Sequence, residues 1–241
     1  IFFAHCSFKW ANLAKNAAGV TVSVVGVAPL NTVRTRVIFD DSTAILTPNI
    51  SPYLVASGIQ YVESSRTSLS ALPAMVFGNM PRDGGHLSFA QDEKLGIVNS
   101  EPDAEVYIHR YLGSDEMING NIRYCLWIED DQAEAASSID KIGERLESVA
   151  EMRASSSADS TRNFAKRPHR FVQTPGIGQR STILVAGVSS ERRRYLPVDL
   201  VPSRYVASNL LFAIFDAPIW CFSLIASRLH LVWVATVCGK L

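Results

Sequence analysis

The sequence lacks any pair of cysteines at metal-binding or redox spacing. Its four cysteines stand apart among apolar or aromatic neighbours, at Cys6, Cys125, Cys221 and Cys238. This excludes a disulfide scaffold and a zinc-finger site, and it predicts reduced, mostly buried thiols in a cytoplasmic protein. The histidines are equally isolated, so we predict no metal site.

The chain also lacks a net charge, because 23 lysines and arginines balance 23 acidic residues. The charges are nevertheless unevenly distributed. Residues 1–140 hold 9 basic and 16 acidic residues, whereas residues 141–204 hold 12 basic and 6 acidic residues. Such asymmetry is typical of chains that contact nucleic acid or membranes. The alternative is a protein with one acidic and one basic face.

We expect neither a signal peptide nor a membrane span in this sequence. The chain begins with Ile1, and no charged segment followed by an apolar one marks a signal peptide. Residues 219–237 approach the length of a membrane helix, but Arg228 and His230 interrupt them. We therefore predict a packing helix preceded by a short strand, and no membrane contact. Because the chain ends directly after this pattern, we expect it to be a fragment of a longer polypeptide.

The first part of the chain contains two patterns typical of strands. Val20–Val27 is rich in β-branched residues and Thr35–Phe39 is a second apolar run, so we expect the two to pair as an edge hairpin. His5–Asn12 has no clean period and is expected to form a loop. Asp40–Pro52 is rich in turn residues, which predicts a domain boundary.

The rest of the chain mixes strand and helix patterns. Strands are expected at Val106–Leu112, Ile122–Ile128 and Thr182–Val188, with a turn at Asn119-Gly120. An amphipathic helix is predicted from residues spaced three or four apart, namely Ile139, Ile142, Leu146, Val149 and Met152. The predicted fold class is therefore mixed α/β (α+β).

Several short stretches together resemble one family. They are His5–Asn12, Val24–Val27, Asn49–Leu54, Gly78–Gly85, Gly113–Gly120, Cys125–Trp127, Val188–Arg193 and Ser227–His230 with Cys238-Gly239. In this order they resemble MmeI-like restriction–modification enzymes. The resemblance implies that residues 1–40 are the edge hairpin that ends a Rossmann-like methyltransferase sheet. It implies that residues 45–241 are a target-recognition domain of mixed sheets and packed helices.

The family resemblance also implies an activity for the parent protein. Members move a methyl group from S-adenosylmethionine to the exocyclic amine of a target adenine in double-stranded DNA, and many carry an endonuclease domain. This sequence has no glycine-rich cofactor loop and no Asn-Pro-Pro-Tyr-type motif, since Asn49-Ile50-Ser51-Pro52 is not one. We therefore expect the fragment to bind no cofactor and to be inactive alone. Its expected partners are duplex DNA and an upstream methyltransferase domain in cis.

Candidate DNA-contacting residues occur in three places. In the loop that closes the family's pocket, Phe8 is a candidate to stack on an extruded base and Lys9 to lie near phosphate, while Trp10 is expected to be packing. The glycine-rich stretch Asn79–Leu87 is expected to form a tight loop, either a phosphate nest or a structural turn, with Arg82 as a phosphate ligand.

The third place is the basic tract from Arg153 to Pro197. We expect its end, Ser189–Pro197, to anchor the DNA backbone or brace the domain, and Pro168–Arg180 with Ile219–Arg228 to read bases. The tract offers Arg153 and His169 among its basic side chains, which we expect to lie on one surface. The predicted DNA-binding cations of the tract and of the stretch Ile219–Arg228 are Arg162, Lys166, Arg167, Arg170, Arg180, Arg192, Arg193, Arg194 and Arg228.

Two other interpretations fit the same basic tract. In the first, a non-enzymatic interaction module uses the tract to bind an acidic protein. In the second, the tract is a solvated basic face that binds no partner. An RNA reader is less well supported, because few aromatic residues lie within the tract.

Overall fold

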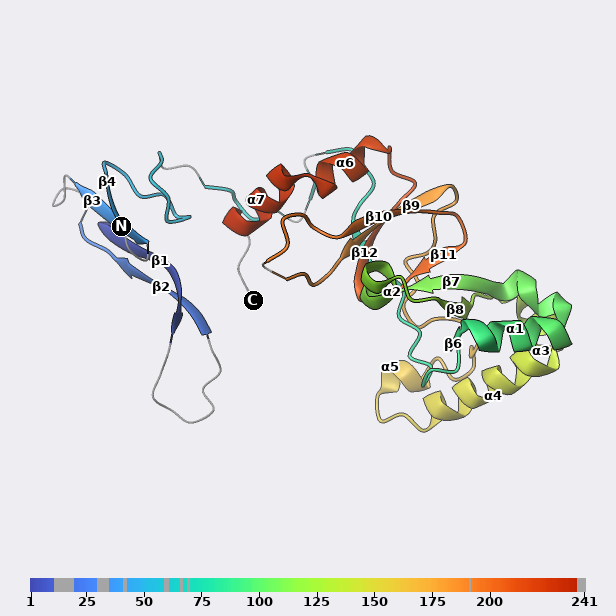
Figure 1. Cartoon of the computed structure of the whole chain (residues 1–241). Coiled ribbons are helices and arrows are strands. Elements are labelled where there is room, and N and C mark those ends of the chain that lie inside the picture. The colour runs from blue at the N-terminus through green and yellow to red at the C-terminus, as the bar shows by residue number, and fades with distance from the viewer. Residues whose placement is uncertain are drawn as a thin grey trace. The chain divides into compact units, whose positions relative to one another are not determined.

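The structure is a computed structural model, and it describes residues 1–10, 20–29, 35–40, 43–58, 61–65, 67–68, 70–190 and 192–237. The chain divides into two compact units (Figure 1). The first comprises Ile1–Thr67 and Val232–Leu241, and the second comprises Ser68–Leu231. Helices and both parallel and antiparallel strand pairs occur, which confirms the predicted mixed α/β class.

The first unit contains a four-stranded sheet in the order β2-β1-β3-β4. Its strands are β1 (Phe3–Trp10), β2 (Val20–Gly26), β3 (Arg36–Asp40) and β4 (Thr43–Thr47). β1 pairs antiparallel with β2 and parallel with β3. The strand expected at 20–27 is therefore confirmed, but the hairpin between it and the next strand is wrong, because β1 lies between them.

Two segments expected to be loops or turns are strands. β1 continues through His5 to Trp10, and its register against β2 shifts between His5 and Phe8. Such an irregularity breaks the two-residue alternation, which explains why the sequence pattern misses the strand. Thr43–Thr47, expected to be a turn, pairs antiparallel with β3. Ala11 and Asn12, the end of the predicted loop, lie outside the described residues.

One sheet of the second unit has the order β10-β9-β12-β5, all antiparallel. The strands are β5 (Val76–Phe77), β9 (Ser181–Ala186), β10 (Val198–Pro202) and β12 (Leu211–Phe215). β9 has five consecutive buried residues, as expected for a central strand covered on both faces. The sequence pattern misses β10, which contains a proline and lies at the sheet edge, where proline is tolerated.

The other sheet of the second unit has the order β11-β7-β8-β6. Its strands are β6 (Ser88–Ala90), β7 (Ile108–Leu112), β8 (Arg123–Leu126) and β11 (Tyr205–Ala207). The predicted turn at Asn119-Gly120 ends a helix instead: α2 (Ser114–Asn119) fills the connection, and Gly120 caps it at a φ of 75°.

Helices α1 (Gln91–Ser100), α3 (Ala133–Ser137) and α4 (Asp140–Ala154) gather beside this second sheet (Figure 1). Short 3₁₀ turns, η1 (Pro102–Tyr107) and η2 (Asp130–Gln132), connect strands and helices, and α5 (Asp159–Arg162) follows α4. The predicted amphipathic helix is confirmed as α4. Its Ile142, Leu146 and Val149 are buried in one core with Leu87 and Trp127.

The long apolar stretch near the end of the chain is broken. It forms α6 (Trp220–Ala226) and α7 (Arg228–Val237), so the prediction of one helix after a short strand is wrong. α6 packs on the β9 sheet through Cys221 and Ile225. Within the described residues no single helix is long and apolar enough to cross a membrane; α6 and α7 reach that length and composition only as a pair bent by 56°.

Candidate nucleic-acid interface

The three arginines of the β9–β10 connection form an exposed cationic loop. The loop begins where the Ala186 amide donates to the Pro197 carbonyl (3.1 Å), which closes the hairpin. Within it, the Arg193 amide donates to the Ser190 carbonyl (3.0 Å), which forms a turn. Arg192, Arg193 and Arg194 are all exposed, and none forms an ion pair with a described carboxylate.

Two arginines in the segment before β9, residues 163–180, form ion pairs with acidic side chains. Asp130 binds Arg167 (2.6 Å) and also the His169 ring (2.8 Å). Glu129 pairs with Arg170. Hydrogen bonds from Arg167 and His169 hold the pKa of Asp130 well below its usual range. These carboxylates come from η2 and the residue before it, far away in the sequence, so the sequence alone gives no sign of the pairing.

The remaining predicted cations have mixed surroundings. Arg162 pairs with Asp159, one turn earlier in α5. Arg82 has a φ of 46° and donates to the hydroxyls of Ser160 (3.1 Å) and Thr161 (3.2 Å). Its side chain therefore ties its loop to α5. The other predicted cations in exposed positions are Lys9, Lys166, Arg180 and Arg228.

Arg153, the first residue of the basic tract, is fully buried, with 0% of its surface exposed. It therefore cannot contact DNA, and counting it with the surface arginines was wrong. A signal was present in the sequence. Arg153 continues the buried stripe of Ile142, Leu146 and Val149 at spacings of four, three and four.

The glycine-rich stretch is the tight loop that the sequence predicts. Gly84 and Gly85 have φ values of 67° and 91°. Asp83 is buried, and its carboxylate accepts a hydrogen bond from the Leu87 amide (2.6 Å), which closes the loop. These contacts favour the structural-turn interpretation over a phosphate nest.

Two polar side chains fix the backbone that leads into β9. The Asn79 side chain is buried. Its Nδ2 donates to the Gly176 carbonyl (2.9 Å), and its Oδ1 accepts a hydrogen bond from the Gly176 amide (3.2 Å). The Asp216 carboxylate accepts hydrogen bonds from the backbone amides of Gln179 (2.9 Å), Arg180 (2.7 Å) and Ser181 (3.1 Å). These amides lower the pKa of Asp216.

Phe8 lies in an aromatic group of the first unit. Its ring centroid lies 4.7 Å from that of His5 and 6.2 Å from that of Trp10. Trp10, expected to be packing, is 50% exposed. Phe8 remains a prediction as a base-stacking residue.

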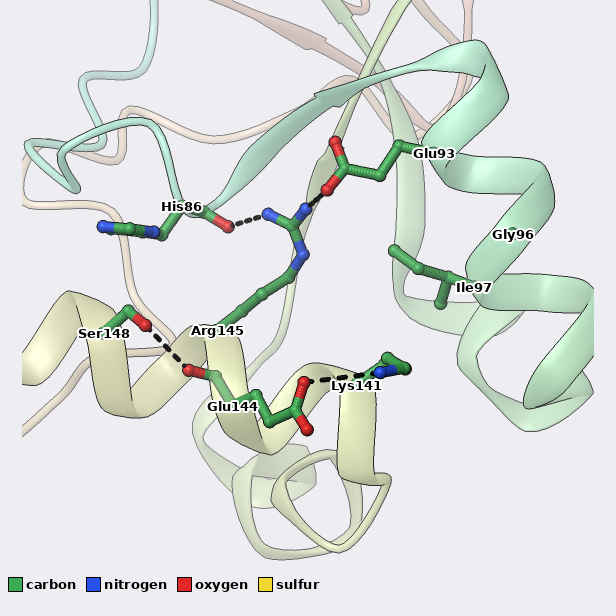
Figure 2. Close-up of a pocket in the computed structure, with 8 residues that line it drawn as sticks. All are labelled: His86, Glu93, Gly96, Ile97, Lys141, Glu144, Arg145 and Ser148. Carbon is green, nitrogen blue, oxygen red and sulfur yellow. Dashed lines mark hydrogen bonds and ion pairs between the residues drawn. The ribbon is translucent and has the colours of Figure 1, made fainter.

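A cleft of about 580 Å³ lies beside α1 and α4. Figure 2 shows Arg145 reaching across it, where the guanidinium donates to the His86 carbonyl (2.5 Å) and pairs with Glu93. On the α4 side, Lys141 pairs with Glu144 (3.5 Å). Because these charges are paired with one another, we assign no ligand to the cleft.

His109 is a buried titratable residue that sequence reasoning set aside. Only 8% of it is exposed, and its Nδ1 has no hydrogen-bond partner among the described residues. Burial, followed by the charge of Arg204, lowers the pKa of His109 to about 4. The folded chain therefore holds this ring neutral at pH values where an unfolded chain protonates it.

We predict that acid destabilises the second unit through His109. The unfolded pKa is 6.5 and the folded pKa is about 4, so stability is lost as the pH falls through this window. Between pH 7.5 and pH 5 the free energy of unfolding should fall by about 2 kcal/mol, measured by urea unfolding. His109→Gln removes the titrating group and should flatten the profile. Equal profiles for both proteins would contradict the prediction.

Asp130 acts only at lower pH, because its unfolded pKa is 3.8 and its folded pKa is lower.

Comparisons with known proteins match the whole chain. Residues 57–241 match the family described as MmeI, target recognition domain, and residues 1–40 match MmeI, DNA-methyltransferase domain. DNA methyltransferase A of Bacillus subtilis (strain 168) is 42% identical over 242 residues, covering 100% of this chain and 27% of that protein.

A solved structure of the type IIL restriction–modification enzyme MmeI in complex with DNA is also similar. It shares 31% sequence identity with a TM-score of 0.80, over 100% of this chain and 33% of that one. The chain thus spans about a third or less of the length of these relatives. Because the target-recognition match covers most of the chain, the chain belongs to the MmeI family and carries its target recognition domain, preceded by a stretch of its DNA-methyltransferase domain.

Proposed function

We propose that the chain selects the target sequence for a site-specific adenine DNA methyltransferase. In this proposal the second unit binds duplex DNA, and the parent protein transfers the methyl group in a domain upstream in the same polypeptide. Support comes from the family match and from the relative that was solved in complex with DNA. The observation that carries the proposal is the exposed loop of Arg192, Arg193 and Arg194.

The loop and the paired arginines suit different tasks. Arginines without a bound carboxylate attract phosphate freely, and each neutralised phosphate releases counterions. Arg167 and Arg170 lie beside Asp130 and Glu129, whose charges repel phosphate. Mixed donors and acceptors of this kind suit base edges better than the DNA backbone. We therefore assign backbone contact to the loop and sequence readout to the paired segment.

The cofactor of the proposed reaction is S-adenosylmethionine, which would supply the methyl group. Among the described residues of the first unit, no strand runs through a glycine-rich turn into a helix, the usual place for such a cofactor on a Rossmann-like sheet. These residues do not fit the cofactor, and we derive no step through it. Phe8 would face the extruded adenine, and the reaction would take place in the cytoplasm.

Salt titration of duplex binding tests this function. With Lys166 and the three loop arginines on phosphates, a log–log plot of affinity against salt should have a slope of about −3.6. One duplex sequence should bind more tightly than its scrambled versions. A module for an acidic protein would show no sequence preference, and polyglutamate would compete with every duplex equally. Equal affinity for all duplexes would overturn the proposal.

A further inference from the structure

The segment that carries Arg167 and Arg170 has no regular secondary structure. Residues 163–180, between α5 and β9, form turns and one isolated bridge at Gln173. Strand or helix hydrogen bonds therefore cannot define the path of this segment. Other contacts must hold its carbonyl groups, because buried carbonyls without partners are costly.

Arg153 provides those contacts from the last turn of α4. Its Nη1 donates to the carbonyls of Phe164 (3.2 Å) and Arg167 (2.9 Å), and its Nη2 donates to that of Arg170 (2.8 Å). The three acceptors are spaced three residues apart. Arg167 and Arg170 also donate their own amides to the preceding acceptor in this series. The segment thus wraps around one guanidinium.

The same guanidinium also reaches the glycine-rich loop. Nη2 donates to the Pro81 carbonyl (2.8 Å) and Nε donates to the Arg82 carbonyl (3.0 Å). All five N–H groups of Arg153 therefore have a backbone carbonyl partner. With the carbonyls turned inward, the side chains of Arg167 and Arg170 reach Asp130 and Glu129.

We propose that Arg153 is a positioning residue for sequence readout: it never touches DNA, but it sets where Arg167 and Arg170 meet the base edges. This inference rests on the proposed function. Lysine cannot replace Arg153, because an ammonium group has three donors and no planar fork. Arg153→Lys keeps the buried charge but must release at least two of the five carbonyls.

The test compares Arg153→Lys with Arg145→Lys in the 241-residue chain. Arg145 lies in the same helix and also donates to a backbone carbonyl. That carbonyl belongs to His86, which lies outside residues 163–180. Affinity for a preferred duplex and for its scrambled version is measured across salt, at a temperature where urea unfolding shows each variant to be folded. Hydrogen exchange compares the amides of residues 164–170 with those of β9.

For Arg153→Lys we expect the preference for the chosen duplex to fall at least tenfold. Binding to the scrambled duplex should be largely retained, and its salt slope should become shallower by at most about 0.9, the contribution of Lys166, because the β9–β10 loop is intact. Amides 164–170 should exchange faster while β9 does not change, and Arg145→Lys should behave as the wild type.

Two results would overturn the inference. One is an unchanged preference in Arg153→Lys while Arg170→Ala alters it. The other is a parallel loss of preferred and scrambled binding, which indicates a merely structural role. Absence of any preference in the wild type is a different result, and it would overturn the proposed function itself.

Discussion

Replacing Arg192, Arg193 and Arg194 together with alanine should weaken binding to duplex DNA on the order of 100-fold at 0.15 M salt. Each lost phosphate contact removes counterion release that contributes about 0.7 log units of affinity at this salt concentration. The slope of log affinity against log salt should become shallower by about 2.7. Fluorescence anisotropy with a labelled duplex measures both quantities.

The loss should be the same for preferred and scrambled duplexes, because phosphate contacts carry no sequence information. The matched control replaces the same three arginines with lysine. Lysine also binds phosphate as a point charge, so the salt slope should be retained. If the alanine variant kept the slope of the wild type, the loop would not lie on the DNA backbone.

Arg153→Met should lower the free energy of unfolding by about 3–5 kcal/mol. Methionine fills much of the space but donates nothing, so five partly buried carbonyls lose the guanidinium, and of these the Phe164 and Arg167 carbonyls keep a backbone amide donor. Asp83 also loses the buried cation that lies nearby. Urea unfolding followed by circular dichroism gives the value.

Arg145→Met is the matched control for this prediction. Arg145 lies two turns earlier in α4, donates to one carbonyl and pairs with the partly exposed Glu93. Its replacement should cost about 1 kcal/mol. Similar losses for the two variants would show that the five carbonyls do not depend on Arg153.

The local elements with a clear apolar period follow from the sequence, whereas their partners do not. The apolar spacing from Ile139 to Val149 predicts α4, and the β-branched run from Val20 predicts β2. Neither pattern shows that β1 separates β2 from β3, because pairing depends on the whole sheet. The break between α6 and α7 has a local cause that the apolar spacing hides, because the Ser227 hydroxyl accepts a hydrogen bond from the His230 amide (3.1 Å) at the start of α7.

The site was predictable as a charge pattern and unpredictable as a set of contacts. The run of arginines at 192–194 is visible in the sequence and proves to be exposed. The ion-pair partners of Arg167 and Arg170 are residues 130 and 129. No local sequence pattern predicts that these residues lie close together. Arg153 is the instructive case. An arginine that falls on the buried stripe of a helix is predicted to be buried and fully hydrogen-bonded. A count of charges along the sequence does not show this.

These contacts give one account of how the second unit would work. α4 buries an apolar stripe and ends in Arg153, which shapes the irregular segment before β9. Asn79 and Asp216 bond to the rest of that segment, and the hairpin after β9 carries the exposed arginines of residues 192–194. The hydrogen-bonded segment of residues 163–180 and the exposed arginine loop thus flank one strand, β9.

In the proposed function, this chain itself chooses a DNA sequence. Selection from a pool of randomised duplexes, with the bound fraction sequenced, tests it most directly. We predict that one short sequence is enriched, and that the alanine variant of the arginine loop enriches the same sequence from a smaller bound fraction. A bound fraction with the same sequence distribution as the input pool would contradict the account.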